Sequence, residues 1–141
     1  MKAVQGVQHV DELDRRYLSP SEEERYEREI RELAASELWK SATADQRAKA
    51  EENLYGAVTG TDKKIVKTLE DGAQYGLDEA EYVLYRLALD MQDQKNQDSK
   101  VGSYTNDEVE AAIRAVDGLT DQERGYLWIA QGKKDKSNPW G

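Results

Sequence analysis

The sequence has no cysteine, no phenylalanine, two prolines and one histidine. Without cysteine, disulfides, thiolate metal sites and cysteine nucleophiles are excluded. The single histidine, His9, excludes histidine-rich metal centres and leaves any catalytic triad dependent on one residue near the N-terminus. No apolar run approaches membrane-spanning length, and the start, MKAVQGVQHV, lacks the apolar core of a signal peptide. We therefore expect a chain that has no membrane partner and is not secreted by a signal peptide.

The sequence also has fewer basic than acidic residues, with 20 Lys and Arg against 29 Asp and Glu. The formal net charge is −9 and the isoelectric point is about 4.7, with 35% charged and 38% hydrophobic residues. Binding to phosphates needs clustered Lys and Arg, so direct binding to nucleic acid is not expected. The hydrophobic content predicts one folded domain with a thin core, to which eight Tyr and three Trp contribute large rings.

What the sequence does have is repeated helix-start chemistry. A capping box places Ser, Thr or Asp at the N-cap and Glu or Gln three residues later, so that each side chain bonds a backbone N–H at the other position. The chain offers five such pairs: Ser19–Glu22, Thr43–Gln46, Asp78–Glu81, Thr105–Glu108 and Thr120–Glu123. Apolar residues follow each start at helical spacing, and no alternating strand pattern occurs.

These signals predict helices over about 20–39, 44–70, 79–91, 106–117 and 121–131, with a short additional helix over 9–18. The second of these is expected as one long helix, although Gly56 and Gly60 interrupt it. A break near Gly60–Thr61 is the alternative. The helix that begins after Asp78 is the most apolar and is expected to be central.

The predicted fold is therefore all-α: an orthogonal bundle of five or six helices that ends in a short helix–turn–helix pair. Residues 1–19 form an N-terminal arm, 20–132 a single helical domain, and 133–141 a mobile basic tail. The final helix pair carries six carboxylates against Arg114 and Arg124, which argues against DNA recognition. The predicted core comprises Ile30, Leu33, Leu54, Val58, Ile65, Leu69, Leu84, Leu87, Met91, Ile113, Leu127 and Trp128.

No catalytic, cofactor or metal site is predicted. The polar loop after Asp90 invites a calcium-loop interpretation, but Lys95 or Lys100 falls where an oxygen ligand is required. Glycine-rich phosphate loops, GxSxG and HExxH are absent from the sequence. Tyr82 and Tyr85 flank Leu84 and favour core and rim positions. The candidate partner-binding residues are Trp140 and Pro139 in the tail, together with Tyr85.

One ordering of motifs extends from about Tyr26 to Pro139. The segments ASELWKSATADQRAKAEENLYG, YGLDEAEYVLYRLAL, TNDEVEAAIRAV and GLTDQERGYLW follow one another, and SNPW comes near the end. This order resembles the C-terminal helical region of large bacteriophage and prophage virion-associated proteins of the type with large polyvalent protein-associated domains. The matching positions are Ser36, Trp39, Thr43, Gln46, Leu119, Thr120, Gln122, Arg124, Leu127, Trp128, Asn138 and Pro139.

The resemblance implies a non-catalytic structural or assembly module of a phage or prophage structural protein. Such a module is normally part of a longer polypeptide, in which case Met1 is not a natural start. Its partners would be other phage structural proteins or the rest of that polypeptide, in the virion or the host-cell cytoplasm. The alternative, motivated by the charge of −9, is a stand-alone acidic inhibitor that mimics nucleic acid and blocks a host DNA-binding protein. Carboxylates arranged in rows like the phosphates of a DNA duplex would favour the mimic. Acidic residues scattered over the whole surface would favour the structural module.

Overall fold

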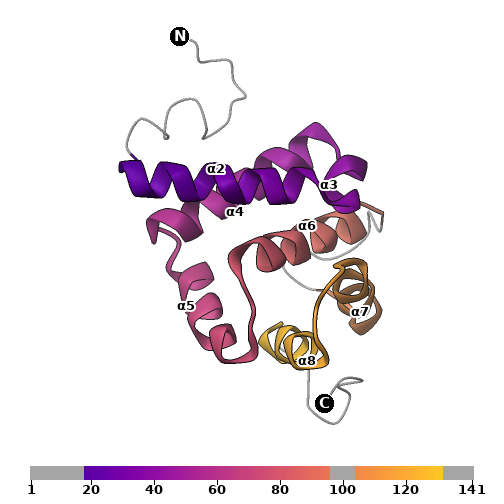
Figure 1. The fold of residues 1–141 in the computed structure, drawn as a ribbon. Coiled ribbons are helices and arrows are strands. Elements are labelled where there is room, and N and C mark those ends of the chain that lie inside the picture. Colours follow the sequence, from indigo (N-terminus) through magenta and orange to yellow (C-terminus); the bar gives the residue numbers. More distant parts are fainter. Residues whose placement is uncertain (1–17, 96–103, 132–141) are drawn as a thin grey trace.

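The computed structural model describes residues 18–95 and 104–131, and over these residues the protein is all-helical, with no strand (Figure 1). The predicted helix over 9–18 and the tail over 133–141 lie outside the described residues. The described elements are α2 (Pro20–Ala34), α3 (Glu37–Ser41), α4 (Ala44–Thr59), α5 (Lys63–Gly72), the 3-10 turn η2 (Ala73–Tyr75), α6 (Glu79–Lys95), α7 (Asn106–Ala115) and α8 (Asp121–Ala130).

All five predicted capping boxes are confirmed. At α8, the Thr120 N–H donates to Glu123 Oε1 at 2.7 Å, and the Glu123 N–H donates to Thr120 Oγ1 at 3.1 Å. The same reciprocal pair begins α2, α4, α6 and α7. Each box satisfies backbone donors that the first turn of a helix leaves without a partner, which fixes where the helix starts.

The predicted helix over 20–39 is wrong in one respect, because it divides into α2 and α3 at Ser36. The Ser36 hydroxyl donates to the Leu33 carbonyl at 2.9 Å and accepts from the Trp39 N–H at 3.1 Å. Serine readily offers the backbone such alternatives to helical hydrogen bonds. It therefore closes α2 and serves as the N-cap of α3.

The single long helix over 44–70 is also wrong, and the alternative break near Gly60 is confirmed. Gly60 ends α4 with a φ of +74°, a left-handed conformation that favours glycine. Asp62 then begins α5 by accepting the Ile65 N–H at 3.2 Å. Gly56 has a different role, because a Cβ placed there would lie 2.7 Å from the Asp62 Cβ. Its missing side chain allows the start of α5 to fold back against α4.

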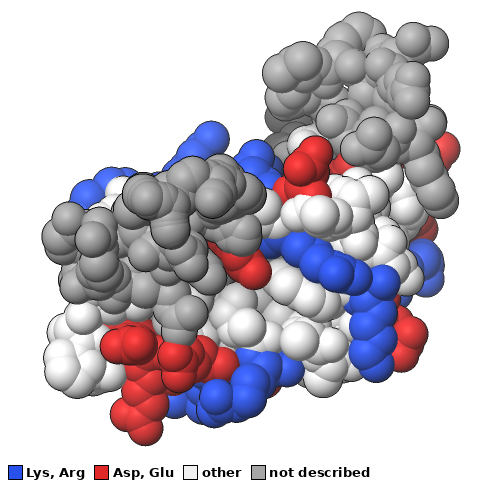
Figure 2. Space-filling view, turned by 90° about the horizontal axis from the view of Figure 1, so that it is seen from above, with Lys and Arg blue, Asp and Glu red and all other residues white. Residues whose placement is uncertain are grey.

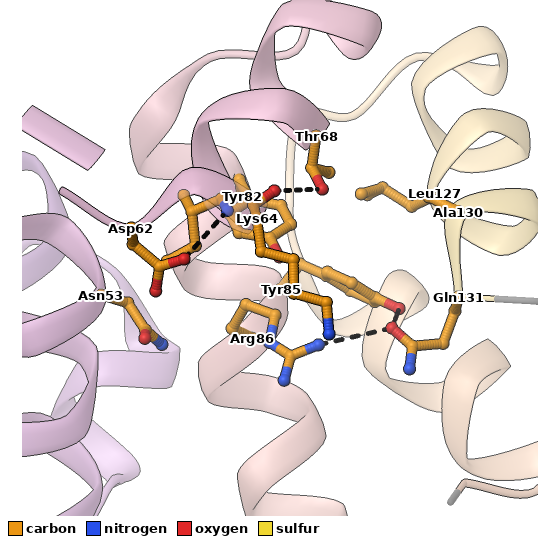
Figure 3. A pocket seen from close by; sticks show the side chains of 11 residues that line it. Asn53, Asp62, Lys64, Thr68, Tyr82, Tyr85, Arg86, Leu127, Ala130 and Gln131 are labelled. Atoms are coloured by element: carbon orange, nitrogen blue, oxygen red, sulfur yellow. Dashed lines mark hydrogen bonds between the residues drawn. The ribbon is translucent and has the colours of Figure 1, made fainter. Parts of the chain in front are cut away.

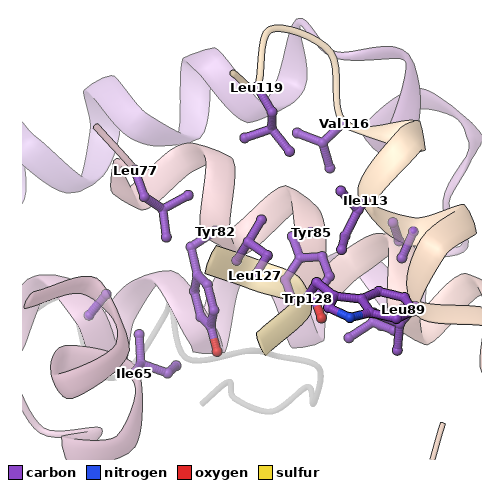
Figure 4. Close-up of a cluster of buried hydrophobic side chains, with 14 residues drawn as sticks. Ile65, Leu77, Tyr82, Tyr85, Leu89, Ile113, Val116, Leu119, Leu127 and Trp128 are labelled. Atoms are coloured by element: carbon purple, nitrogen blue, oxygen red, sulfur yellow. The ribbon is translucent and has the colours of Figure 1, made fainter. Parts of the chain in front are cut away.

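As predicted, α6 is central. It contacts α2, α3 and α4 on one side and α7 on the other, while α8 packs on α7, α5 and η2. In Figure 1, α6 runs between the α2–α4 layer and the α7–α8 pair. Ala80 and Val83 join the cluster formed with α2 and α4, whereas Tyr82, Tyr85 and Leu89 join the larger cluster with α5, α7 and α8 (Figure 4).

The predicted core is largely correct. Eight of its members are buried: Leu33, Leu54, Val58, Ile65, Leu87, Ile113, Leu127 and Trp128. Four are only partly buried: Ile30, Leu69, Leu84 and Met91. The prediction placed the buried residues of α6 on a single stripe through Leu84 and Met91. It misassigned part of the core because α6 is apolar on two sides. Leu84 lies at the border of both clusters, and Val83 and Leu89 are fully buried.

Replacement of Trp128 by alanine tests this core. The Trp128 ring is 2% exposed, so Trp128→Ala is expected to lower the free energy of unfolding by about 3–5 kcal/mol. The neighbouring Ile129 is 49% exposed, and Ile129→Ala should cost less than about 1 kcal/mol. Chemical denaturation of both variants measures the difference. A loss below roughly 1 kcal/mol for Trp128→Ala would contradict the packing described here.

Candidate functional site

A polar pocket lies between α4, α5, α6 and the end of α8 (Figure 3). Its volume is about 210 Å³. Polar side chains from four helices line it: Asn53, Asp62, Lys64, Thr68, Arg86 and Gln131. Tyr82 and Tyr85 add their rings, and Ile65 and Leu127 supply an apolar wall. The pocket therefore combines hydrogen-bonding groups with a surface that can contact a small organic molecule.

Two cations face this pocket. Lys64 comes from the exposed first turn of α5, and Arg86 is half-buried on α6. Arg86 Nη1 donates to Gln131 Oε1 at a long 3.4 Å, and the Tyr85 hydroxyl donates to the same oxygen at 3.0 Å. Neither Lys64 nor Arg86 forms an ion pair with any carboxylate among the described residues. Asp62 is the one carboxylate that lines the pocket beside them.

The two tyrosines of the pocket remain neutral hydroxyls at physiological pH. Burial raises the pKa of Tyr82 and, more strongly, that of Tyr85, whereas the nearby Arg86 opposes both shifts. The Tyr82 hydroxyl is hydrogen-bonded to the Thr68 side chain (Figure 3). Because each phenol stays protonated, it can donate a hydrogen bond and does not provide a phenolate base. The pocket is chemically suited to binding.

A second hollow of about 410 Å³ is an open groove between α2, α5 and the start of α6. Five apolar residues line it, and we call them its floor: Ala57, Val66, Leu69, Ala73 and Leu77. We call the carboxylates that also line it its rim: Glu29, Glu70, Asp78 and Glu79, with Arg25 as the single cation among the lining residues. We call this feature the acid-rimmed groove.

Arg25 does not neutralise that rim. Its guanidinium is paired with Glu79, with Nε donating to Oε1 at 3.1 Å, which leaves Glu29, Glu70 and Asp78 as excess negative charge. Burial raises the pKa of the Glu29 carboxyl, and the charges of Glu32 and Asp78 raise it further. The groove therefore favours an apolar ligand that brings positive charge with it.

A pair of carboxyl groups joins the starts of α6 and α8. Glu123 is 4% exposed, and its carboxyl group lies near that of the partly buried Glu81. Each carboxyl group also accepts the N–H of its own N-cap residue, which completes a capping box. Burial raises the pKa of the Glu81 carboxyl to about 7, and the neighbouring carboxyl groups of Asp78 and Glu123 contribute to the increase. Gly76 packs against the pair, since a Cβ there would lie 3.1 Å from Glu123 Oε2.

Of the three candidate partner-binding residues, Trp140 and Pro139 lie outside the described residues. Tyr85 is 1% exposed, with its ring in the core and its hydroxyl on Gln131. This is the core position that the sequence favoured for it, and it presents no surface to a partner in this arrangement.

Sequence reasoning missed both hollows. A signal for the polar pocket was available, however, because Lys63 and Lys64 occupy the first turn of α5, where the helix dipole favours acids. Arg86 gave no such signal, since its approach to Lys64 depends on how α5 and α6 pack.

Over residues 18–95 and 104–131, no three side chains among His, Cys, Asp and Glu come together as metal ligands would. Over the same ranges, no helix is long and apolar enough to cross a membrane. The calcium-loop interpretation rejected from the sequence concerns a segment of which residues 96–103 lie outside the described part.

The Glu81 carboxyl predicts a pH dependence of stability. Its pKa is raised from 4.5 to about 7 in the folded protein, so the folded state binds more protons than the unfolded chain between these values. Its contribution to stability is therefore full below pH 4.5 and is lost as the pH rises to 7. Glu81→Gln keeps the cap acceptor and donates an amide to Glu123. At pH 8 it should raise the free energy of unfolding by roughly 1 kcal/mol, allowing for solvent screening.

Denaturant unfolding at pH 5 and pH 8 measures this effect. Glu22→Gln makes the same substitution in the Ser19 capping box and should leave the pH dependence unchanged. An identical pH dependence in Glu81→Gln and the unaltered protein would contradict the raised pKa of the Glu81 carboxyl.

Comparisons of this chain with protein-family models, with curated proteins and with solved structures give no match. Chemical assignments therefore rest on the side chains themselves. Three features carry chemistry within the described residues: a polar pocket with two cations that form no ion pair, an apolar groove with an acidic rim, and the neighbouring carboxyl groups of Glu81 and Glu123, of which Glu81 has a raised pKa.

Proposed function

We propose that this chain is a non-catalytic interaction module of a phage or prophage structural protein. The observation that carries the proposal is the acid-rimmed groove, where an apolar floor from α4, α5 and η2 stays open beside uncompensated carboxylates. The sequence resemblance to phage virion-associated proteins supports the assignment to that class of protein. The partner is another structural protein or a further part of the same polypeptide.

The composition of the groove specifies how such a partner would bind. Its floor accepts aliphatic side chains, as grooves that receive one face of an amphipathic helix do. Glu29, Glu70 and Asp78 would attract Lys or Arg beside that apolar face and disfavour acidic competitors. A short amphipathic segment with basic flanks therefore fits the groove.

The distribution of surface charge also supports this proposal over the nucleic-acid mimic. A mimic needs carboxylates in rows that resemble duplex phosphates. On the face shown in Figure 2, Lys and Arg side chains are interspersed with Asp and Glu. The acid-rich helix α2 itself carries Arg25, Arg28 and Arg31 among its acids. Mixed charge of this kind is typical of a solvated helix surface.

The proposal includes the finer architecture: an orthogonal bundle that ends in a helix–turn–helix pair formed by α7 and α8. Gly118, with a φ of +87°, turns the chain between these helices, and the two helices contact each other. Their acidic first turns, with Asp107, Glu108, Asp121 and Glu123, are unsuited to phosphate contacts. In this proposal the pair packs on α6 and does not read DNA.

Affinity capture with the tagged chain tests the proposed function. From a lysate in which the source phage or prophage is induced, the chain should enrich phage structural proteins, identified by mass spectrometry. Val66→Arg places a cation on the groove floor, where it blocks apolar contacts and repels a basic partner. We expect this variant to reduce enrichment at least about tenfold.

Ile129→Arg is the matched control, because it adds the same group at an exposed apolar position on α8 outside the groove. It should capture the same proteins as the unaltered chain. Equal capture by both variants would contradict the role of the groove. The acidic mimic would be favoured instead if the chain enriched host DNA-binding proteins and if added duplex DNA displaced those proteins from it.

A further inference from the structure

The polar pocket concentrates positive charge within an acidic protein. Among its lining residues, Lys64 and Arg86 are cations and Asp62 is the one carboxylate, whereas the chain as a whole carries a net charge of −9. Asp62 Oδ1 is already engaged, since it accepts the Ile65 N–H as the N-cap of α5. Asp62 is thus used for helix capping, and it forms an ion pair with neither cation.

The two cations also converge. Figure 3 shows the Lys64 and Arg86 side chains extending toward the same part of the pocket, beside Gln131 and the Tyr85 ring. Like charges brought together without an acid between them repel, and a bound anion relieves that repulsion. Long-range repulsion from the other acids is weak at physiological salt, where the Debye length is about 8 Å. The local cations therefore determine which ligand is favoured.

The size of the pocket limits the ligand. A volume of about 210 Å³ exceeds the roughly 150 Å³ cavity that can hold benzene, and it lies below the roughly 300 Å³ at which drug-sized pockets begin. The large apolar side chains of its lining are buried, and Tyr82 and Ile65 keep the most exposure among them, at 8% and 6%. A single ring or short aliphatic chain fits this space together with one anionic group.

We propose that this pocket binds a small organic oxyanion, a carboxylate or a phosphate monoester. Arg86 and Lys64 hold the anionic group, and the organic part lies along the Tyr82 ring and Ile65. Binding would exchange the long 3.4 Å hydrogen bond from Arg86 to Gln131 for charge-assisted bonds to the anion. This site is separate from the acid-rimmed groove, and its ligand is independent of any protein partner.

Titration of the full-length, ¹⁵N-labelled chain tests the proposal. The probes are benzoate, phenyl phosphate and neutral benzyl alcohol, which share a ring and differ in the charged group. We expect saturable amide shifts around Lys64, Arg86 and Gln131 with at least one anion, at millimolar or tighter affinity, and binding by benzyl alcohol at least tenfold weaker. Comparison of the two anions then distinguishes a carboxylate from a phosphate ligand.

Charge-removing variants locate the binding. Arg86→Met and Lys64→Met should each weaken anion binding about tenfold, because each removes a charge-assisted bond. Lys64 is exposed, so its variant reports on the site even if Arg86→Met fails to fold. Lys40→Met is the matched control, since Lys40 lies elsewhere and pairs with Glu37. Three outcomes would overturn the proposal: no saturable shift at the pocket, equal binding of benzyl alcohol, or equal weakening by Lys40→Met.

Discussion

The burial of α6 on two opposite sides is the constraint on which the rest of the fold depends. Val83 and Leu89 are both fully buried, yet Val83 packs with α2 and α4 while Leu89 packs with α7 and α8. One helix thereby joins two apolar clusters into a single structure. In a chain with only 38% hydrophobic residues, this sharing lets a limited apolar surface stabilise all the described helices. The polar pocket and the acid-rimmed groove both include residues of α6 or of the segment that leads into it.

Capping chemistry determines where the helices meet. Glu108 and Glu123 are buried carboxyl groups, at 5% and 4% exposure, and each accepts the N–H of its own N-cap threonine. A buried carboxylate without such partners would cost several kcal/mol. Glu123 also lies near Glu81, whose carboxyl pKa is raised chiefly by burial. The capping residues at the starts of α6 and α8 thus lie where the two helices meet, and the raised pKa of Glu81 makes stability sensitive to pH.

Local chemistry explains what could be predicted from the sequence. The five capping boxes depend on residues three positions apart, and all five occur as expected. The two helix breaks are more instructive. Gly60 indicated the break that the structure shows. The helical spacing of apolar residues continues across Gly60, however, and this favoured the incorrect prediction of one continuous helix. Ser36 gave no signal beyond its residue type, and its hydroxyl bonds to Leu33 and Trp39 become apparent only in the folded backbone.

The candidate sites could not be predicted in this way, because they form between helices. Lys64 and Arg86 are brought together by the packing of α5 on α6 and α8, which no local pattern specifies. Tyr85 could be predicted in part, since its position beside Leu84 favoured the core or its rim, and it is buried at 1% exposure. On a helix that is buried on two sides, nearly every large apolar position turns inward, so surface assignments on α6 fail.

Native-state hydrogen exchange of the full-length chain tests the central role of α6 most directly. If this helix joins both clusters, its amides from Val83 to Leu89 should exchange only through global unfolding, with protection equal to the free energy of unfolding. Amides of α2 and α8, each packed against one cluster, should exchange faster through partial opening. Protection of α6 below that of α2 or α8 would contradict the account, because the helix would then open while its neighbours remained folded.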